Sequence, residues 1–391
     1  MKKIVLTTLA LFLVAGGIAM AQNECDALYI KAMQANSAAE RVPLLKEFLA
    51  KCSGKGSQYE NFANAFLCTT VYQKTDQETI AYGEKALALG GLDDQLKSQV
   101  LTALAVVYNK QGQNPEKTKA YANQLIQTAT SMKAKEPENA NWNNLIGIGY
   151  FIIGQTQDKA KDRKGALDSY QTSYGILKDA KILGEMKKIA KAEYEAKAYA
   201  DAEKVFRFLA QTNPKDMESQ RLVGECLYKT GKTQEALAIF KEIHAKRRSG
   251  EMAYNIGIIL AREAKTNPVL IQDAIRFLLD AALLYPAQSK RSMELAENLY
   301  YSNDKEWNNR VKLMQESKQL IDEWAKTINT KFGDKSEEDL TPDQRREYRK
   351  INELIDKEQK VLEDLQAKQK ASMEGFNKLL EEAKQRLGIK K

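Results

Sequence analysis

Between about residues 145 and 286, apolar positions recur with the spacing of an α-helix. Four stretches each place an alanine four residues before a bulky side chain, namely Ala166/Tyr170, Ala202/Phe206, Ala236/Phe240 and Ala274/Leu278. Four residues make about one helical turn, so both members of each pair lie on one face of a helix. A further small residue precedes each pair, at Gly147, Ala190, Gly224 and Gly257. The pattern predicts successive helix pairs. No segment alternates as a half-buried strand would.

The bulky members of successive pairs stand 36, 34 and 38 residues apart. This period resembles that of the tetratricopeptide repeat, which is about 34 residues. Residues 216–248 carry the resemblance most clearly, with Val223-Gly224 on a first helix, Thr230-Gly231-Lys232 in a turn and Phe240 on a second helix. The resemblance implies an all-α fold, an α-α superhelix of antiparallel helix pairs. It also implies a surface that binds partners rather than an active site.

Two repeat units are longer than this period. Seven extra residues fall within 155–164, and five fall around 265–268. Because a connecting loop grows at little entropic cost, we expect both insertions to lie between helices.

The chain divides into segments of different character. Upstream of residue 140 the resemblance weakens, although Leu104-Ala105, Tyr108 and Gly112 are typical of another first helix. The predicted organisation is a signal peptide (1–21), degenerate helical hairpins (22–140), tetratricopeptide-like repeats (141–290), terminal capping helices (291–330) and a charged helical, coiled-coil-like segment (331–391).

The C-terminal segment has its own helix signals. Thr341-Pro342-Asp343-Gln344 predicts an N-cap with proline at the first helical position, and Gly388 is placed to end the helix. Ile351, Ile355, Leu362 and Leu365 fall near heptad spacing, but Glu358, Gln369 and Ser372 interrupt the seam. Two interpretations remain open: a coiled-coil arm for self-association, or a hairpin folded back against residues 307–328. The imperfect seam favours the hairpin.

The N-terminus predicts export. Lys2 and Lys3 precede an apolar run over 4–18, and Ala19-Met20-Ala21 provides small residues for cleavage after Ala21. A retained membrane anchor is the alternative, and the shortness of the run argues against it. No later stretch approaches the roughly 18 apolar residues that span a bilayer. We expect a chain exported to a bacterial periplasm, or otherwise secreted.

An oxidising compartment makes the four cysteines informative. Cys25 would begin the first mature helix and Cys52 would end the second, so an antiparallel hairpin brings them to the same end. A Cys25–Cys52 disulfide is one prediction, with Cys52–Cys68 as its competitor. Cys226 lies on a repeat helix, and we expect it to be a buried, unreactive thiol.

The sequence offers little for catalysis. His244 is the only histidine, among lysines and glutamates on the outer turn of a repeat helix, where a solvated histidine is expected. There is no CxxC pair, no glycine-rich phosphate loop and no histidine-based metal set. The net charge of +8 is spread over both signs and does not indicate nucleic-acid binding. We therefore expect no enzyme, cofactor or metal.

The resemblance also implies which residues line a concave groove on the first helices. Lys187, Lys191 and Arg221 would form a basic stretch suited to an acidic or carboxylate-ended peptide. The full set of expected groove residues is Asn144, Ile148, Lys187, Lys191, Tyr194, Arg221, Glu225, Tyr228, Tyr254 and Ile258.

Two function classes follow from these features. The first is a non-enzymatic periplasmic scaffold or adaptor that binds a protein or peptide partner in the groove, as an accessory of envelope assembly or secretion. The alternative is a structural protein that forms homo-oligomers through its C-terminal helix and uses no groove.

Overall fold

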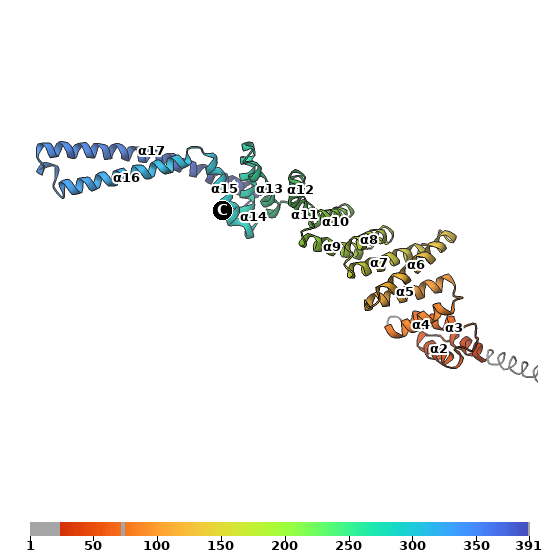
Figure 1. Ribbon diagram of the computed structural model, residues 1–391. Coiled ribbons are helices and arrows are strands. Elements are labelled where there is room, and N and C mark those ends of the chain that lie inside the picture. The colour runs from red at the N-terminus through yellow and green to blue at the C-terminus, as the bar shows by residue number, and fades with distance from the viewer. Residues whose placement is uncertain (1–23, 72–74, 390–391) are drawn as a thin grey trace, which may run out of the picture. The chain divides into compact units, whose positions relative to one another are not determined.

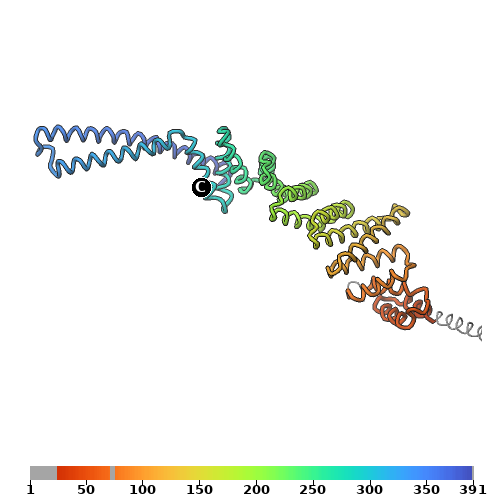
Figure 2. Tube along the Cα trace, viewed as in Figure 1, coloured from red at the N-terminus to blue at the C-terminus, as the bar shows by residue number. Residues whose placement is uncertain are grey.

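The computed structural model describes residues 24–71 and 75–389. The expected signal peptide lies outside these residues. Within them the chain is helical and contains no strand. It forms two compact units, which divide between Lys197 and Ala198, and consecutive helices pack against each other within each unit (Figures 1 and 2). The predicted all-α array of helix pairs is confirmed.

The first unit consists of helices joined by short turns. Residues 24–33 are helical, and the helices that follow are α2 (Ala38–Cys52), α3 (Glu60–Val71), α4 (Asp76–Leu89), α5 (Asp94–Gln111), α6 (Pro115–Lys135), α7 (Ala140–Lys159), α8 (Arg163–Leu177) and α9 (Ala180–Glu195).

The second unit continues with shorter helices and ends in two long ones. They are α10 (Tyr199–Thr212), α11 (Met217–Lys229), α12 (Thr233–Lys246), α13 (Gly250–Glu263), α14 (Ile271–Leu284), α15 (Ser289–Asn303), α16 (Trp307–Phe332) and α17 (Pro342–Leu387). Short 3-10 turns stand before α14, α15 and α17, at η1 (Pro268–Leu270), η2 (Pro286–Gln288) and η3 (Glu337–Asp339).

The small residues of the repeat pattern lie where two helices come closest. A Cβ atom on Gly224 would stand 2.6 Å from Cε1 of Phe240, and one on Gly257 would stand 2.9 Å from Leu278. Gly147 is similarly close to Leu177, and Ala190 is fully buried. At the three glycines a larger side chain would meet a side chain of the paired helix, which accounts for small residues at these positions.

The two insertions behave differently from each other. The extra residues around Lys265 do lie between helices, in the turn that leads to η1. The extra residues at 155–159 instead prolong α7, which makes α7 a helix of 20 residues with its C-cap at Ala160. The expectation of a longer loop there is wrong, because Thr156 and Gln157 are held by Asn109 and Ser169 on neighbouring helices.

At the N-terminal end of the first unit, Cys25 and Cys52 are joined by a disulfide across the hairpin of residues 24–33 and α2. The bond lies within a core that contains Tyr29, Phe48 and Leu67. The ring of Tyr29 stacks on Tyr59 with centroids 4.4 Å apart. Cys68 is not bonded to Cys52 and is fully buried as a thiol.

A carboxylate ties three helices of the first unit together. Glu84 on α4 accepts hydrogen bonds from the Tyr108 hydroxyl (2.7 Å) on α5, and from the Tyr121 hydroxyl (3.0 Å) and Lys117 Nζ (2.6 Å) on α6. Burial by itself raises the pKa of Glu84, but these hydrogen bonds outweigh it and hold the pKa below its usual value.

Replacing Glu84 with glutamine is expected to lower the free energy of unfolding of the first unit by about 1 kcal/mol at pH 7, since charge-assisted bonds become neutral ones at a partly exposed site. The pKa of Glu84 is lowered by folding. The carboxylate therefore stabilises the fold above its unfolded pKa, and this contribution is lost as the pH falls through its folded pKa. The difference between wild type and variant, measured by urea unfolding, should shrink towards zero in acid.

The control for this prediction is Glu116→Gln. The Glu116 side chain is 83% exposed, so this change should have little effect at any pH. A loss in the Glu84 variant that is equally large in acid and at neutral pH would contradict the proposed role of the charge.

The two long helices of the second unit form an antiparallel hairpin (Figure 1). The polar residues that interrupt the α17 seam are paired across it. Glu358 accepts from the Ser317 hydroxyl at 2.6 Å, and Arg310 donates to Gln369 at 3.2 Å and to Ser372 at 3.1 Å. Of the two interpretations of this segment, the structure has the folded-back hairpin, and α17 begins at the expected N-cap Thr341, which forms a capping box with Gln344.

The C-terminal part of α17 belongs to the core of the second unit. Phe376 and Ala383 are buried among Ile275, Leu278 and Ala296 of α14 and α15. Near the end of α17, Arg386 forms an ion pair with Asp280 at 2.5 Å, and its carbonyl accepts from Arg248 at 2.9 Å. The last helix therefore closes the apolar end of the repeat array, which an open solenoid leaves uncovered.

Candidate functional site

The expected groove residues of the first unit lie on α7 and α9. Asn144 is exposed on α7. Ile148 is half-buried against Ala105, Ala122 and Ile152, so its side chain contributes to the core as well as to the surface. Lys187, Lys191 and Tyr194 lie on α9, where Lys191 is exposed and the other two are half-buried.

The expected groove residues of the second unit are engaged with neighbouring side chains. Arg221 forms an ion pair with Glu225 one turn away on α11, and it lies 3.4 Å from Glu251 on α13. The guanidinium of Arg262 lies 5.7 Å from the centroid of the Tyr228 ring. A binding role for Arg221 must therefore compete with two carboxylates of its own chain.

The remaining two expected groove residues, Tyr254 and Ile258, pack against other side chains. The rings of Tyr254 and Tyr285 meet edge to face, with centroids 6.2 Å apart. Ile258 packs against the core that α17 completes. Lys187 and Lys191 belong to the first unit and Arg221 belongs to the second. The expected basic stretch is therefore divided between the two units.

Arg221 does border a cavity at one end of α11, α12 and α13. The cavity has a volume of about 430 Å³. Its apolar lining comes from Met217, Ile243, Met252 and Leu284. Its charged lining comes from Arg221, Arg247 and Arg248 together with Glu218 and Glu251. A concave site whose apolar lining includes a few charged groups is a candidate for ligand binding.

Two of the three arginines were not predicted from the sequence as binding residues. Arg247 and Arg248 follow α12, and in the sequence they are typical of cations at the C-terminal end of a helix. In the structure Arg248 donates to the carbonyl of Arg386 at 2.9 Å. The Arg247 side chain is exposed. Only the packing of α13 beside α12 brings these side chains to the same cavity as Arg221.

His244 is less exposed than the sequence suggests. It is half-buried, its Nδ1 lies 3.2 Å from the carbonyl oxygen of Ser249, and its ring meets Phe277 edge to face at 5.7 Å. The expectation of a solvated histidine is wrong for this reason. The contacts connect the end of α12 to the start of α13 and form no arrangement with a nucleophile.

The two thiols outside the disulfide are buried. Burial raises the pKa of Cys68 to about 12, and burial together with Glu225 and Glu203 raises that of Cys226 to about 12. A thiol with so high a pKa carries almost no thiolate at neutral pH and is a poor nucleophile. Both cysteines therefore act as packed side chains.

A second hollow, in the first unit, is polar. Its volume is about 710 Å³, and Asp93, Asp94, Glu136 and Trp142 contribute to its lining. Asp93 already accepts from the backbone N–H of Leu96 at the start of α5, and Glu136 accepts from the Trp142 indole at 2.7 Å. These carboxylates hold helix ends in place. Among the described residues there is no group of three or more side chains suited to hold a metal ion.

No helix in 24–71 or 75–389 is long and apolar enough to cross a membrane.

Comparisons with known proteins give structural likenesses only. No protein-family model matches the sequence, and no curated protein matches it. A tetratricopeptide repeat protein from Parabacteroides merdae is 15% identical, with a TM-score of 0.31, over 71% of this chain and 100% of that one.

Two further solved structures are similarly distant. A thermophilic tetratricopeptide repeat protein of Thermus thermophilus is 14% identical, with a TM-score of 0.22, over 61% of this chain and 98% of that one. The tetratricopeptide repeat domain of P58(IPK) is 14% identical, with a TM-score of 0.27, over 76% of this chain and 97% of that one. All three carry the repeat that this sequence resembles.

Proposed function

We propose that this array of tetratricopeptide-like helix pairs is a non-enzymatic scaffold that binds a protein or peptide partner. We place it in the periplasm, as an accessory of envelope assembly or secretion machinery. The observation that carries the proposal is the α11–α13 cavity, whose lining combines apolar side chains with three arginines and two glutamates.

The chemistry of this cavity selects the partner. Met217, Ile243 and Met252 offer apolar surface, and methionine side chains adapt to ligands of different shape. Arg247 supplies an exposed guanidinium at the cavity. Guanidinium groups bind carboxylates through paired, charge-assisted hydrogen bonds. The segment that fits is an apolar residue next to a carboxylate, either an acidic side chain or a chain end.

Two observations support the absence of catalysis and the export of the chain. Arg221 of the cavity lining pairs with Glu225 and Glu251, and neither pair holds a nucleophile beside a base. Cys25 and Cys52 are positioned to form a disulfide, which persists in an oxidising compartment such as the periplasm.

The test compares two matched double variants of the full-length protein. Arg221→Gln with Arg247→Gln removes two cations at the cavity. Lys229→Gln with Lys241→Gln removes two exposed cations of α11 and α12 that do not line the cavity. Each protein is cross-linked in a bacterial envelope extract, the captured partner is identified, and its binding segment is titrated by calorimetry as a free acid and as an amide.

We expect the cavity variant to bind the purified segment about tenfold more weakly or worse, and the control variant to bind as wild type does. Amidation of the carboxylate should weaken binding to wild type by a similar factor. Equal binding by all three proteins would overturn the role of the cavity. A third variant, Lys187→Gln with Lys191→Gln, then tests the surface of α9.

A further inference from the structure

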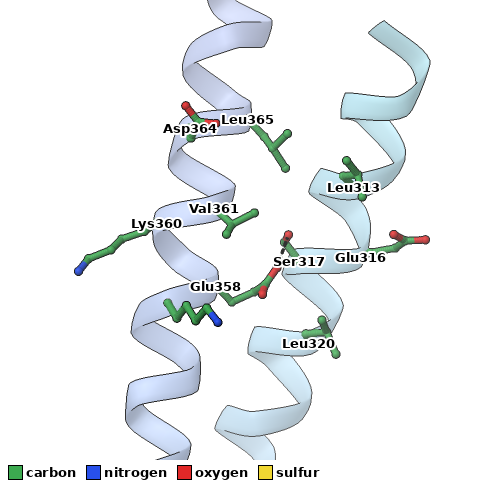
Figure 3. Close-up of a pocket in the computed structure, with 10 residues that line it drawn as sticks. Leu313, Glu316, Ser317, Leu320, Glu358, Lys360, Val361, Asp364 and Leu365 are labelled. Carbon is green, nitrogen blue, oxygen red and sulfur yellow. Dashed lines mark hydrogen bonds between the residues drawn. The ribbon is translucent and has the colours of Figure 1, made fainter. Parts of the chain in front are cut away.

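One side of the α16–α17 hairpin is apolar although nothing in residues 24–71 and 75–389 covers it. Leu313 and Leu320 on α16 are 38% and 39% exposed, and Leu354 and Val361 on α17 are 39% and 42% exposed. These four residues are called the apolar stripe below. Figure 3 shows Val361 and Leu365 pointing from α17 towards α16, with Leu313 and Leu320 opposite them. Between them lies a groove of about 620 Å³.

The stripe lies beside the seam of the hairpin and stays partly exposed. The helices meet through a seam that includes Ser317, Glu358 and Leu365. The members of the stripe are spaced by seven residues on each helix and flank this seam on one side. A two-helix seam requires two apolar positions in seven, whereas a third one marks a helix of a larger bundle. The other flank of α17 carries exposed Gln359 and Gln366.

The borders of the stripe carry opposite charges. On α16 the next positions outward hold exposed Glu316 and Glu323, and on α17 they hold exposed Lys350 and Lys357. Two charges of the opposite sign lie near them: Lys312 is 3.5 Å from Glu316, and Asp364 lines the groove beside Lys357. In Figure 3 Glu316 points away from α17. The hydrogen bond between Ser317 and Glu358 sets Glu316 and Lys357 at the same level along the hairpin. Seven residues further towards the tip, Glu323 and Lys350 share a level in the same way.

We propose that a second copy of this hairpin covers the stripe, related by a two-fold axis parallel to the helices, so that both tips point the same way and the two hairpins form a four-helix bundle. In this arrangement α16 of each copy lies over α17 of the other. Glu316 then faces Lys357 of the partner subunit, and Glu323 faces Lys350 of the partner subunit. The same contacts occur twice, because a two-fold interface is self-complementary.

Charge selects this arrangement over the other two-fold pairing. With the tips pointing in opposite directions, α16 would lie over α16 and α17 over α17. Carboxylates would then face carboxylates and lysines would face lysines, which destabilises an interface. The proposal is independent of the partner-binding function above, since the α11–α13 cavity and the stripe share no residue.

The first test measures the mass of residues 22–391, which contain the whole described structure, by sedimentation equilibrium up to about 100 µM, a range that detects micromolar dimers. We expect a dimer for wild type and for the control Gln359→Glu with Gln366→Glu, which adds two charges on the polar flank. Leu320→Glu with Val361→Glu should be monomeric. Circular dichroism checks that each variant keeps its helical content.

The second test exchanges the border charges. Glu316→Lys with Glu323→Lys, and Lys350→Glu with Lys357→Glu, should each weaken self-association about tenfold or more, because like charges now meet at both edges. An equimolar mixture of the two variants should regain wild-type association, since lysines of one face glutamates of the other.

Several results would overturn the proposal. These are a monomeric wild type, an oligomer larger than a dimer, or a dimer that survives the two glutamates in the stripe. A mixture of the charge variants that stays monomeric would exclude the stated orientation. Loss of a captured partner by the cavity variant, with the dimer intact, would show that the two functions are separate.

Discussion

Replacing Phe376 with alanine is expected to lower the free energy of unfolding of the unit from Ala198 onward by about 3–5 kcal/mol, the usual loss for a buried phenylalanine. Phe376 is only 3% exposed, although it lies on the charged C-terminal helix. Its ring meets those of Tyr300 and Tyr301, with centroids 5.5 and 5.8 Å away, and it belongs to the core formed by α14 and α15. The variant leaves a cavity where the last helix joins that core.

The matched control is Met373→Ala on the same helix, since Met373 is 49% exposed and its removal leaves no cavity. Because the chain has two units, unfolding is best followed locally, by hydrogen exchange of the α14 and α15 amides in increasing urea. Equal effects of the two substitutions would show that α17 does not contribute to this core.

This role of α17 limits what a truncation can reveal. Removing residues 331–391 would expose Ile275, Leu278 and Ala296, which Phe376 and Ala383 cover. The shortened chain would gain an apolar surface of its own and would be prone to associate through it. Self-association through the hairpin therefore has to be tested by substitutions on its exposed side.

Replacing both Cys25 and Cys52 with serine is expected to lower the free energy of unfolding of the first unit by about 3 kcal/mol. The bond joins residues 27 apart in sequence and restricts the unfolded chain accordingly. It lies at the end of the helical array, where fewer neighbours hold the first hairpin in place. The free energy of unfolding of the wild type, measured with urea in the absence and in the presence of a reductant, should differ by the same amount as that of wild type and variant.

Cys68→Ala separates the two pairings that the sequence left open. The thiol of Cys68 is buried, but its replacement by alanine removes only one sulfur atom, and it eliminates any Cys52–Cys68 bond. Proteolytic mapping should recover the Cys25–Cys52 peptide from this variant as from wild type. A Cys52–Cys68 peptide from wild type, or a urea midpoint that reductant does not change, would contradict the expected contribution.

Much of the fold could be predicted because the signals that carry it are local. Asp216 accepts from the backbone N–H of Ser219 at the start of α11, and Gly231 adopts a positive φ in the turn that the sequence marks. The start of α17 at Thr341 and its end at Gly388 were likewise readable from capping residues. A cap is formed by residues within one helical turn of each other, so it can be predicted almost entirely from the local sequence.

The candidate site was predicted less completely because it depends on which helices pack together. Arg221 was expected at a binding surface and does line the cavity, but its ion pair with Glu225 and its approach to Glu251 follow from the packing of α11 and α13. Ile148 and Ile258 were expected to be exposed in the groove, but each is partly buried against a hydrophobic core. Arg247 became a candidate only when the structure placed it beside Met217 and Met252.

The sequence by itself determined the all-α class, the period of the helix pairs, the position of most turns and the long last helix. Each of these rests on spacing within about one helical turn or on a repeat of such spacing. Tertiary structure alone decided that the residues at 155–159 extend α7 and that Phe376 completes a distant core. It also left Leu320 and Val361 uncovered on one side of the hairpin. These outcomes depend on contacts between residues far apart in the chain, and one sequence does not specify which apolar faces meet.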